Sequence, residues 1–380
     1  TFKPVAMNIT PTANIQKLPR HFLPVDFKVT NWEALEPFFK NLLDRKIESR
    51  ADLEKWMKDG SELEAAVSED ACWRQIQMTC DTENKSLEEA FNFFVMEIQP
   101  KIQPYADALN KKLINSPFLK ELDERKYFTY LRSVRKSIEL FREENIPLQA
   151  ELGVMQQQYG QITGRMTIEY NQKEYTLQQA AKFLESKDRT ERETVYRKIN
   201  DRRLQDKDTL NELYTKLIEK RHQVALNAGF ANYRDYKFKE MGRFDYTPND
   251  CLLFHEGVKQ YVLPLVENIY RHKKEKLGLD ILRPWDLEAE REGVQPLKPF
   301  TTGKELLEKS IRCFEKINPF FADCLRKMKS LKHFDLESRK GKAPGGYNCP
   351  LAESGAPFIF MNAAGQMGDV TTMIDRKSVV

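Results

Sequence analysis

The sequence is poor in the residues that most often build metal sites and disulfide frameworks. It has five histidines and six cysteines in 380 residues. The histidines lie far apart and form no ligand pair, and the cysteines include no C-x-x-C pair. A disulfide framework is therefore excluded, and the cysteines are expected to be reduced, mostly buried thiols of a cytoplasmic protein.

Glycine, proline, long apolar runs and blocks of one charge are also scarce. The 16 glycines and 18 prolines, with 31% charged residues, indicate a helical protein and not a disordered or all-β one. No run approaches the roughly 20 apolar residues of a membrane helix, and the first residues lack the pattern of a secretory signal. The 61 basic and 57 acidic residues are spread along the chain, so neither a membrane nor nucleic acid is an expected partner.

Regularly spaced apolar residues predict a helical N-terminal half. In "NWEALEPFFKNLLDR" they recur at helical spacing behind Asn31, which can cap the first turn. Longer helical patterns cover about 49–80, 86–114 and 117–144, with prolines as kinks or breaks. A chain of 380 residues is long enough for at least two lobes around a large core.

The periodicity changes to that of a β-hairpin near the middle of the chain. Apolar and polar residues alternate from Met166 to Tyr170, and Asn171 and Gln172 can turn the chain back. Thr176 then begins the Thr-x-x-Gln pattern of a capping box, so a helix is expected to follow the hairpin at once.

Three further helices are predicted in the second half. One amphipathic pattern runs from Arg189 to about Ala228 and stops at Gly229, and another begins where Thr247 can cap and Pro248 fills the first turn. A third is expected over about 302–328. The helix after Thr247 carries an apolar stripe formed by Phe254, Val258, Tyr261, Val262, Leu265 and Ile269.

The composition changes again in "KHFDLESRKGKAPGGYNCPLAESGAPFIFMN". Two short strands, "HFDL" and "PFIFMN", flank a glycine-rich loop, an arrangement typical of an α+β site region. Asp369 stands where a helix cap belongs, so a new helix is predicted to start ahead of Val370.

Two strings resemble chemical motifs but lack an essential part. "FHEGVKQY" has the start of a zinc helix, yet the residue four positions after His255 is Lys259 and not a second histidine. "RKGKAPGGYN" places Gly345 and Gly346 beside basic residues without the spacing of a phosphate loop. Paired glycines do permit close approach of another chain, so this loop can line a cleft or simply form a tight turn.

The strand "PFIFMN" has two interpretations. Most apolar runs belong to the core, which favours an interior strand. An edge strand would instead leave backbone groups free to pair with an extended peptide.

The run "FDLESRKGKAPGGYNCPLAESGAPFIFMNAAGQMGDVTTMI" resembles the approach to the active site in the oligoendopeptidase F branch of the thimet oligopeptidase family of zinc metallopeptidases. It has the glycine-rich "GKAPGGYN", the strand "PFIFMN" and the helix start "DVTTM" in the family's order. The hairpin from Thr163 to Tyr175 resembles the oligoendopeptidase N-terminal module. Residues 1–374 fit the resemblance.

The resemblance implies a mainly α, multi-helical, two-lobed peptidase fold with a small β-hairpin and short strands near the active-site cleft. Residues 1–190 would form an N-terminal helical lobe, with the oligoendopeptidase module at about 115–185. Residues 191–374 would form the first part of the metallopeptidase catalytic domain. The implied activity is a zinc metalloendopeptidase that hydrolyses short oligopeptides.

The resemblance also implies substrate-side positions. The strand that would pair with substrate and the loop beside it contribute Gly345, Gly346, Tyr347, Asn362, Ala363, Ala364 and Gly365. The family's Zn²⁺ would be held by an H-E-x-x-H motif directly after Ile374 and by a Glu on a later helix. This sequence has "DRKSV" at the motif's place, so the ligands and the catalytic residues of the family are not present in this chain.

We therefore expect a chain truncated just before its zinc motif, with the C-terminal part of the fold missing. "DRKSVV" can be encoded by a common sequencing-library adapter read in frame, which predicts that residues 375–380 are a non-native tail. The polypeptide is expected to be inactive, and Phe358 and Phe360 are expected to lack packing partners. The alternative is a non-catalytic helical pseudo-peptidase or peptide-binding scaffold.

Overall fold

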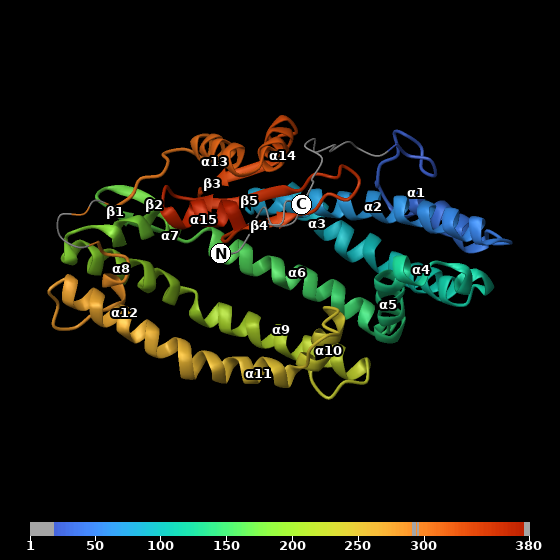
Figure 1. Cartoon of the computed structure of the whole chain (residues 1–380), viewed down its shortest axis with the longest axis horizontal. Coiled ribbons are helices and arrows are strands. Elements are labelled where there is room, and N and C mark those ends of the chain that lie inside the picture. The colour runs from blue at the N-terminus through green and yellow to red at the C-terminus, as the bar shows by residue number, and fades with distance from the viewer. Residues whose placement is uncertain (1–18, 291–293, 295, 376–380) are drawn as a thin grey trace, which may run out of the picture.

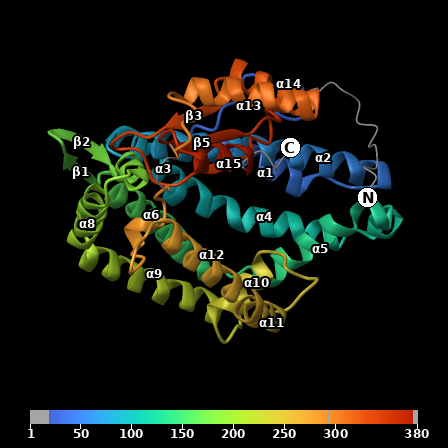
Figure 2. The same cartoon turned by 60° about the vertical axis from the view of Figure 1, so that its left-hand side comes forward.

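The computed structural model describes residues 19–290, 294 and 296–375. Figures 1 and 2 show a mainly helical molecule with two small sheets, which confirms the predicted fold class. Among the described residues, no helix is both long and apolar enough to cross a membrane. Of the predicted tail at 375–380, Asp375 is the last residue of a helix, and residues 376–380 lie outside the described residues.

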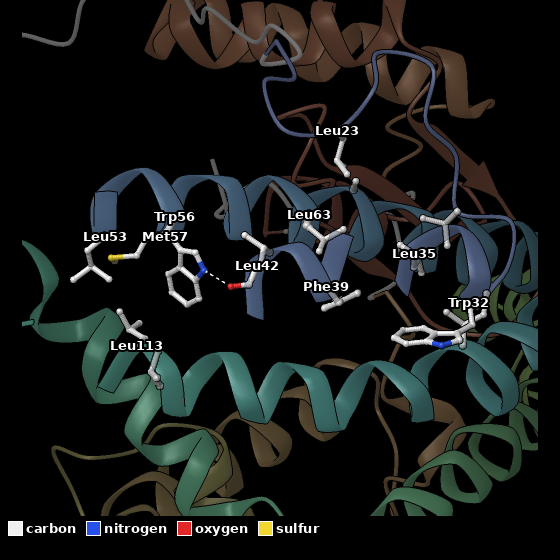
Figure 3. Close-up of a cluster of buried hydrophobic side chains, with 14 of the residues drawn as sticks. Leu23, Trp32, Leu35, Phe39, Leu42, Leu53, Trp56, Met57, Leu63 and Leu113 are labelled. Atoms are coloured by element: carbon white, nitrogen blue, oxygen red, sulfur yellow. Dashed lines mark hydrogen bonds between the residues drawn. The ribbon is translucent and has the colours of Figure 1, made fainter. Parts of the chain in front are cut away.

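The described residues up to Leu140, called the N-terminal lobe in the description of the structure, contain five α-helices, joined partly by a π-helical turn at Phe94–Ile98 and a 3₁₀ turn at Pro117–Glu121. The helices are α1 (Trp32–Asp44), α2 (Arg50–Cys80), α3 (Lys85–Phe93), α4 (Gln99–Ile114) and α5 (Glu124–Leu140). The predicted cap is confirmed, because the Asn31 side chain accepts a hydrogen bond from the backbone of Ala34. Buried apolar side chains of α1, α2, α4 and α5 form one core, part of which is seen in Figure 3, where the Trp56 indole donates to the carbonyl of Leu42 at 2.8 Å.

The predicted hairpin follows the long helix α6 (Asn145–Gly164) and is confirmed. Strands β1 (Thr167–Tyr170) and β2 (Lys173–Thr176) pair antiparallel, and both turn residues have a positive φ. The Thr176 capping box then starts the short helix α7 (Leu177–Ala181).

The single helical pattern predicted from Arg189 divides into two helices at Asp206. These are α8 (Arg189–Gln205) and α9 (Lys207–Asn227), after which Gly229, with φ +85°, stops the helix as expected. The short helix α10 (Tyr233–Glu240) leads to the next long segment.

The segment that begins at Thr247 contains α11 (Pro248–Gly257), a π-helical turn (Val258–Val262) and α12 (Leu263–Lys276). Its predicted capping residues are confirmed. Figure 1 shows α11 and α12 along one outer edge of the molecule, and no residue of this segment is buried. The apolar stripe predicted here is therefore on the surface; Phe254, for example, is 70% exposed.

The C-terminal region consists of a three-stranded sheet and three helices. These are α13 (Gly303–Ile317), α14 (Pro319–Ser330), β3 (Phe334–Glu337), β4 (Tyr347–Cys349), β5 (Phe358–Ala363) and α15 (Met367–Asp375). The helix predicted over about 302–328 is broken between α13 and α14, where Asn318 caps α14 and Pro319 opens it. The strand order is β3-β5-β4, with β5 parallel to β3 and antiparallel to β4.

Helices cover both faces of this sheet. Alternate side chains of β5 pack on α13 and α14 through Ile359 and Met361, and on α2 through Phe358 and Phe360. The expectation that the two phenylalanines lack partners is wrong: Phe360 is fully buried and stacks on Tyr347. A strand buried on both faces has a continuous apolar sequence, which explains "FIFM".

Candidate functional site

The glycine-rich loop between β3 and β4 is anchored to two helix ends. The Gly341 amide donates to the carbonyl of Gly164 at the end of α6 (3.2 Å), and its carbonyl accepts from the amide of Thr82 (2.7 Å). Two residues later, the Ala343 amide donates to the carbonyl of Thr79 in α2 (2.9 Å). Gly164 itself must be glycine, because a Cβ there would lie 2.8 Å from the Lys342 carbonyl oxygen. The loop thus ties the N-terminal lobe and α6 to the sheet.

Lys342 holds the loop against the sheet from inside the protein. Its side chain is fully buried, and Nζ donates to the carboxylate of Asp335 (2.8 Å) and to the carbonyls of Glu337 (3.0 Å) and Met361. The ammonium also lies 4.4 Å from the centre of the Phe360 ring. The sequence analysis assigned Lys342 no role, because a lysine beside other basic residues in a loop gives no local sign of burial.

Asp335 is the anionic centre that makes this burial possible. Burial alone would raise the pKa of Asp335, but hydrogen bonds from Arg339, Cys80 and Lys342 outweigh it and lower the pKa to about 2. Burial lowers the pKa of Lys342 and raises that of Cys80 to about 12. An ionised Asp335 therefore lies between two cations.

Two of the predicted site residues, Asn362 and Gly345, are brought together. The Asn362 amide donates to the carbonyls of Ala343 (2.8 Å) and Gly345 (2.9 Å), which fixes the loop over the end of β5. Gly345 is exposed with φ +89°, a conformation that favours glycine. Gly346 lies against β5, since a Cβ there would be 3.1 Å from the Phe360 carbonyl oxygen.

The side chain of Tyr347, a third predicted residue, points into the protein. Its ring stacks on that of Phe360 with a centroid distance of 4.7 Å, and its hydroxyl lies 2.6 Å from the Thr79 hydroxyl. Burial raises the pKa of Tyr347 well above its usual range. Only the backbone of Tyr347 remains as a possible contact for a ligand at the sheet edge.

The remaining predicted positions lie between β5 and α15. Ala363 is buried, and its carbonyl accepts from the Ser338 amide. The amides of Ala364 and Gly365 donate to one carboxylate oxygen of Asp369, each at 2.9 Å. Asp369 is thus not the residue ahead of the helix, as predicted; it lies in the first turn of α15 and reaches back to bind these amides.

The sheet topology corrects the role expected for "PFIFMN". Phe360 pairs with Asp335 of β3 on one side and with Tyr347 of β4 on the other. The prediction that this strand offers a free edge is therefore wrong, and the interior interpretation is confirmed. Within this sheet the strands at the edges are β3 and β4. Sequence periodicity could not separate the two cases, because both give an apolar run.

A pocket of about 520 Å³ adjoins these residues at the start of α15. It is lined by Gln366, Met367, Gly368 and Asp369, by the segment around Glu185, and by parts of 288–297. Gln366 bridges the two sides by donating to Glu185 at 2.7 Å. Gly365 directly precedes the lining residue Gln366, but none of the seven predicted residues lines this pocket.

The described residues do not form a metal site. Within the described part of the chain, no three His, Cys, Asp or Glu side chains lie close enough together to hold a metal ion. His255, the histidine of the incomplete zinc string, is exposed on α11.

Two family models match the chain. The model described as "Peptidase M3 N-terminal domain" matches residues 22–141, and that described as "Peptidase family M3" matches residues 182–380, more than half of the chain. No curated protein matches.

Solved structures share the fold. A putative oligoendopeptidase F from Bacillus anthracis str. Ames is 23% identical with a TM-score of 0.86, and the match covers 93% of this chain and 65% of that one. "PZ peptidase A with inhibitor 2" is 23% identical with a TM-score of 0.86, over 94% of this chain and 64% of that one. The chain thus spans less than two thirds of their lengths, and at these identities the likeness shows the fold alone.

Proposed function

We propose, from the premise that this chain belongs to peptidase family M3, that it forms the N-terminal lobe and one cleft wall of a metalloendopeptidase that hydrolyses short oligopeptides. The observation that carries the proposal is the family match over residues 182–380. This stretch includes the glycine-rich loop, the sheet and the start of α15.

The sheet edge offers a physical route to peptide binding. An extended peptide can add a strand to an exposed edge, where backbone hydrogen bonds provide affinity for many sequences. We assign this role to the backbone at Gly345, Gly346 and Tyr347, because β4 is an edge strand and Gly345 is exposed. Asn362 would act indirectly by holding the Gly345 carbonyl. Ala363, Ala364 and Gly365 would connect the sheet to the pocket at the start of α15.

Zinc is the metal that the resemblance implies for this activity. The described residues include no group of His, Cys, Asp or Glu side chains that could bind it. The 380-residue sequence also contains no H-E-x-x-H. We therefore assign no residue of this chain a catalytic role and expect the 380-residue polypeptide alone to be inactive.

Activity and metal content test this directly. The purified chain is incubated with a quenched fluorogenic nonapeptide with and without added ZnSO₄, and bound zinc is measured after gel filtration. We expect no turnover and no stoichiometric zinc. Zinc-dependent hydrolysis by this polypeptide would contradict the proposal.

Peptide binding tests the assignment of the cleft wall. Fluorescence anisotropy of a labelled short peptide should show saturable binding that Asn362→Ala weakens, since the loop loses both hydrogen bonds from the amide. Asn249→Ala, at an exposed position of α11, is the matched control. Equal affinities of the two variants would remove Asn362 and its loop from the proposed site.

We also infer the cellular setting and the domain division. The six cysteines all lie in the described part of the chain and form no disulfide bond there, which supports a cytoplasmic location. Short peptides are the proposed partners, and the mixed charge does not favour nucleic acid. We propose a helical lobe over 1–190, with a module at about 115–185, and the start of a catalytic domain over 191–374.

A further inference from the structure

A cleft enters the core of the N-terminal lobe, and it shares no lining residue with the pocket at the start of α15. Its outer part, about 820 Å³, lies between α2, α5 and the chain near Arg20. Its inner part, about 240 Å³, is enclosed largely by apolar side chains of α1, α2 and α4. Met57, Ser61 and Tyr130 line both parts, so the two adjoin.

The walls of the inner part are the lobe's own core. Figure 3 shows Leu42, Trp56 and Leu113, which line it, between α2 and α4. Protein interiors contain few voids larger than a water molecule, whereas apolar cavities of about 150 Å³ accept a benzene molecule. A space of 240 Å³ is large enough for a phenyl ring or a short alkyl chain.

Gly60 is an independent sign that this space is open. It lies in the middle of the 31-residue helix α2 and lines the inner part. A Cβ at Gly60 would meet no atom within 4 Å, whereas one at Gly153 of α6 would lie 2.9 Å from a Val95 methyl group. Glycine is less favourable than alanine inside a helix, and close packing does not account for it at Gly60.

Two lysines at the rim of the outer part have no ion-pair partner among the described residues. Glu62 accepts hydrogen bonds from three backbone amides, including that of Leu23, and Glu353 pairs with Arg20. By contrast, neither Lys58 nor Lys126 forms an ion pair within the described part of the chain.

The other two carboxylates that line the cleft, Glu54 and Glu64, form no ion pair with these lysines in the described part of the chain. Glu54 is engaged by Arg50 at 3.2 Å. Glu64 lines only the inner part, whereas both free lysines line only the outer one.

We propose that this cleft binds a small amphipathic anion, with an aromatic or aliphatic body in the inner part and a carboxylate between Lys58 and Lys126. The apolar walls select the body by burying it. The lysines select a carboxylate over an uncharged or cationic end group. Two kinds of molecule have this chemistry: a free carboxylic acid, and a peptide whose last residue has a large apolar side chain.

Calorimetric titration of the full 380-residue chain tests the proposal. The probes are 4-phenylbutyrate, 4-phenylbutanol and 4-phenylbutylamine, which share one body and differ in the end group. We expect the carboxylate to bind at least about tenfold more tightly than the alcohol and the amine more weakly than both. Saturable binding should quench fluorescence in the wild type and not in Trp56→Phe.

A large side chain introduced into the inner part should weaken binding without changing the lysines at the rim of the outer part. Gly60→Phe is expected to lose at least about tenfold in affinity, while Gly60→Ala, which adds one methyl group to open space, retains binding. Thermal melts confirm that each variant folds. The double variant Lys58→Ala, Lys126→Ala should lose the preference for carboxylate and keep the affinity for the alcohol.

The source of the anion is distinguished by two more probes. Octanoate represents free acids, and acetyl-Gly-Phe, compared with its C-terminal amide, represents a peptide end; binding of either acid supports the proposal. Absence of saturable binding by all carboxylates, equal affinity for 4-phenylbutyrate and 4-phenylbutylamine, or undiminished binding by folded Gly60→Phe would each overturn it.

Discussion

The N-terminal lobe and the α11–α12 segment use similar apolar residues in opposite ways. In the lobe, Leu35 and Leu42 are fully buried within a single core. In the α11–α12 segment, Leu253 and Leu265 are 71% and 61% exposed. Both regions have apolar residues at helical spacing, so spacing marks the apolar positions of a helix but does not supply the partner that covers them.

The same contrast between a buried and an exposed side chain occurs within one loop, at two lysines that are two residues apart. Lys342 is buried with four oxygen partners, whereas Lys340 is exposed beside Glu174. Lys342→Met keeps the side-chain length but removes the charge, leaving buried carbonyls without a donor. We expect a loss of about 3–5 kcal/mol in the free energy of unfolding, measured by urea denaturation.

Lys340→Met is the matched control and should leave the unfolding midpoint unchanged, because its ion pair with Glu174 is fully solvated. Equal effects of the two substitutions would show that the buried ammonium does not anchor the glycine-rich loop.

Truncating a leucine in each region compares their packing directly. Leu42→Ala should lower the free energy of unfolding by about 2–5 kcal/mol, because it opens a cavity in the lobe's core. Leu265→Ala should change it by less than about 0.5 kcal/mol, since the side chain is exposed. A large loss for Leu265→Ala in dilute solution would mean that another surface covers this segment.

Asp335 gives the buried cluster a defined pH dependence. Its pKa in the folded protein, about 2, is below the ordinary 3.8, so it stabilises the fold above about pH 4 and loses this contribution as the pH falls toward 2. From this shift, ionised Asp335 contributes about 2 kcal/mol. Wild type and Asp335→Asn are compared by urea denaturation from pH 6 to pH 2.

The gap in stability between these two proteins should narrow as the pH falls through that window. A gap that stays constant over the window would assign the effect of the substitution to lost geometry and not to the charge of Asp335.

The smallest expected effect on stability is at the exposed stripe. Replacing Phe254, Tyr261 and Ile269 by lysine should reduce binding of the dye ANS and light scattering, because all three are exposed apolar side chains. The free energy of unfolding should change by less than about 0.5 kcal/mol. Unaltered dye binding would place the accessible apolar surface elsewhere.

Sequence determined the features of this protein that depend on a few neighbouring residues. The Asn31 cap, the turn at Asn171 and Gln172, the Thr176 capping box and the stop at Gly229 all occur as predicted. Each is a hydrogen bond or a backbone conformation that forms within about four residues, so its chemistry is visible in the sequence itself.

Only the tertiary structure decided which side of each element is covered. It placed β5 between two strands, turned Lys342 and Tyr347 inward, and left the stripe on α11 and α12 exposed. These outcomes depend on partners many residues away along the chain, such as Thr79 for Tyr347. An apolar strand or a basic loop has the same sequence pattern at an edge as in an interior, and the energy that separates the two comes from contacts that the local pattern does not contain.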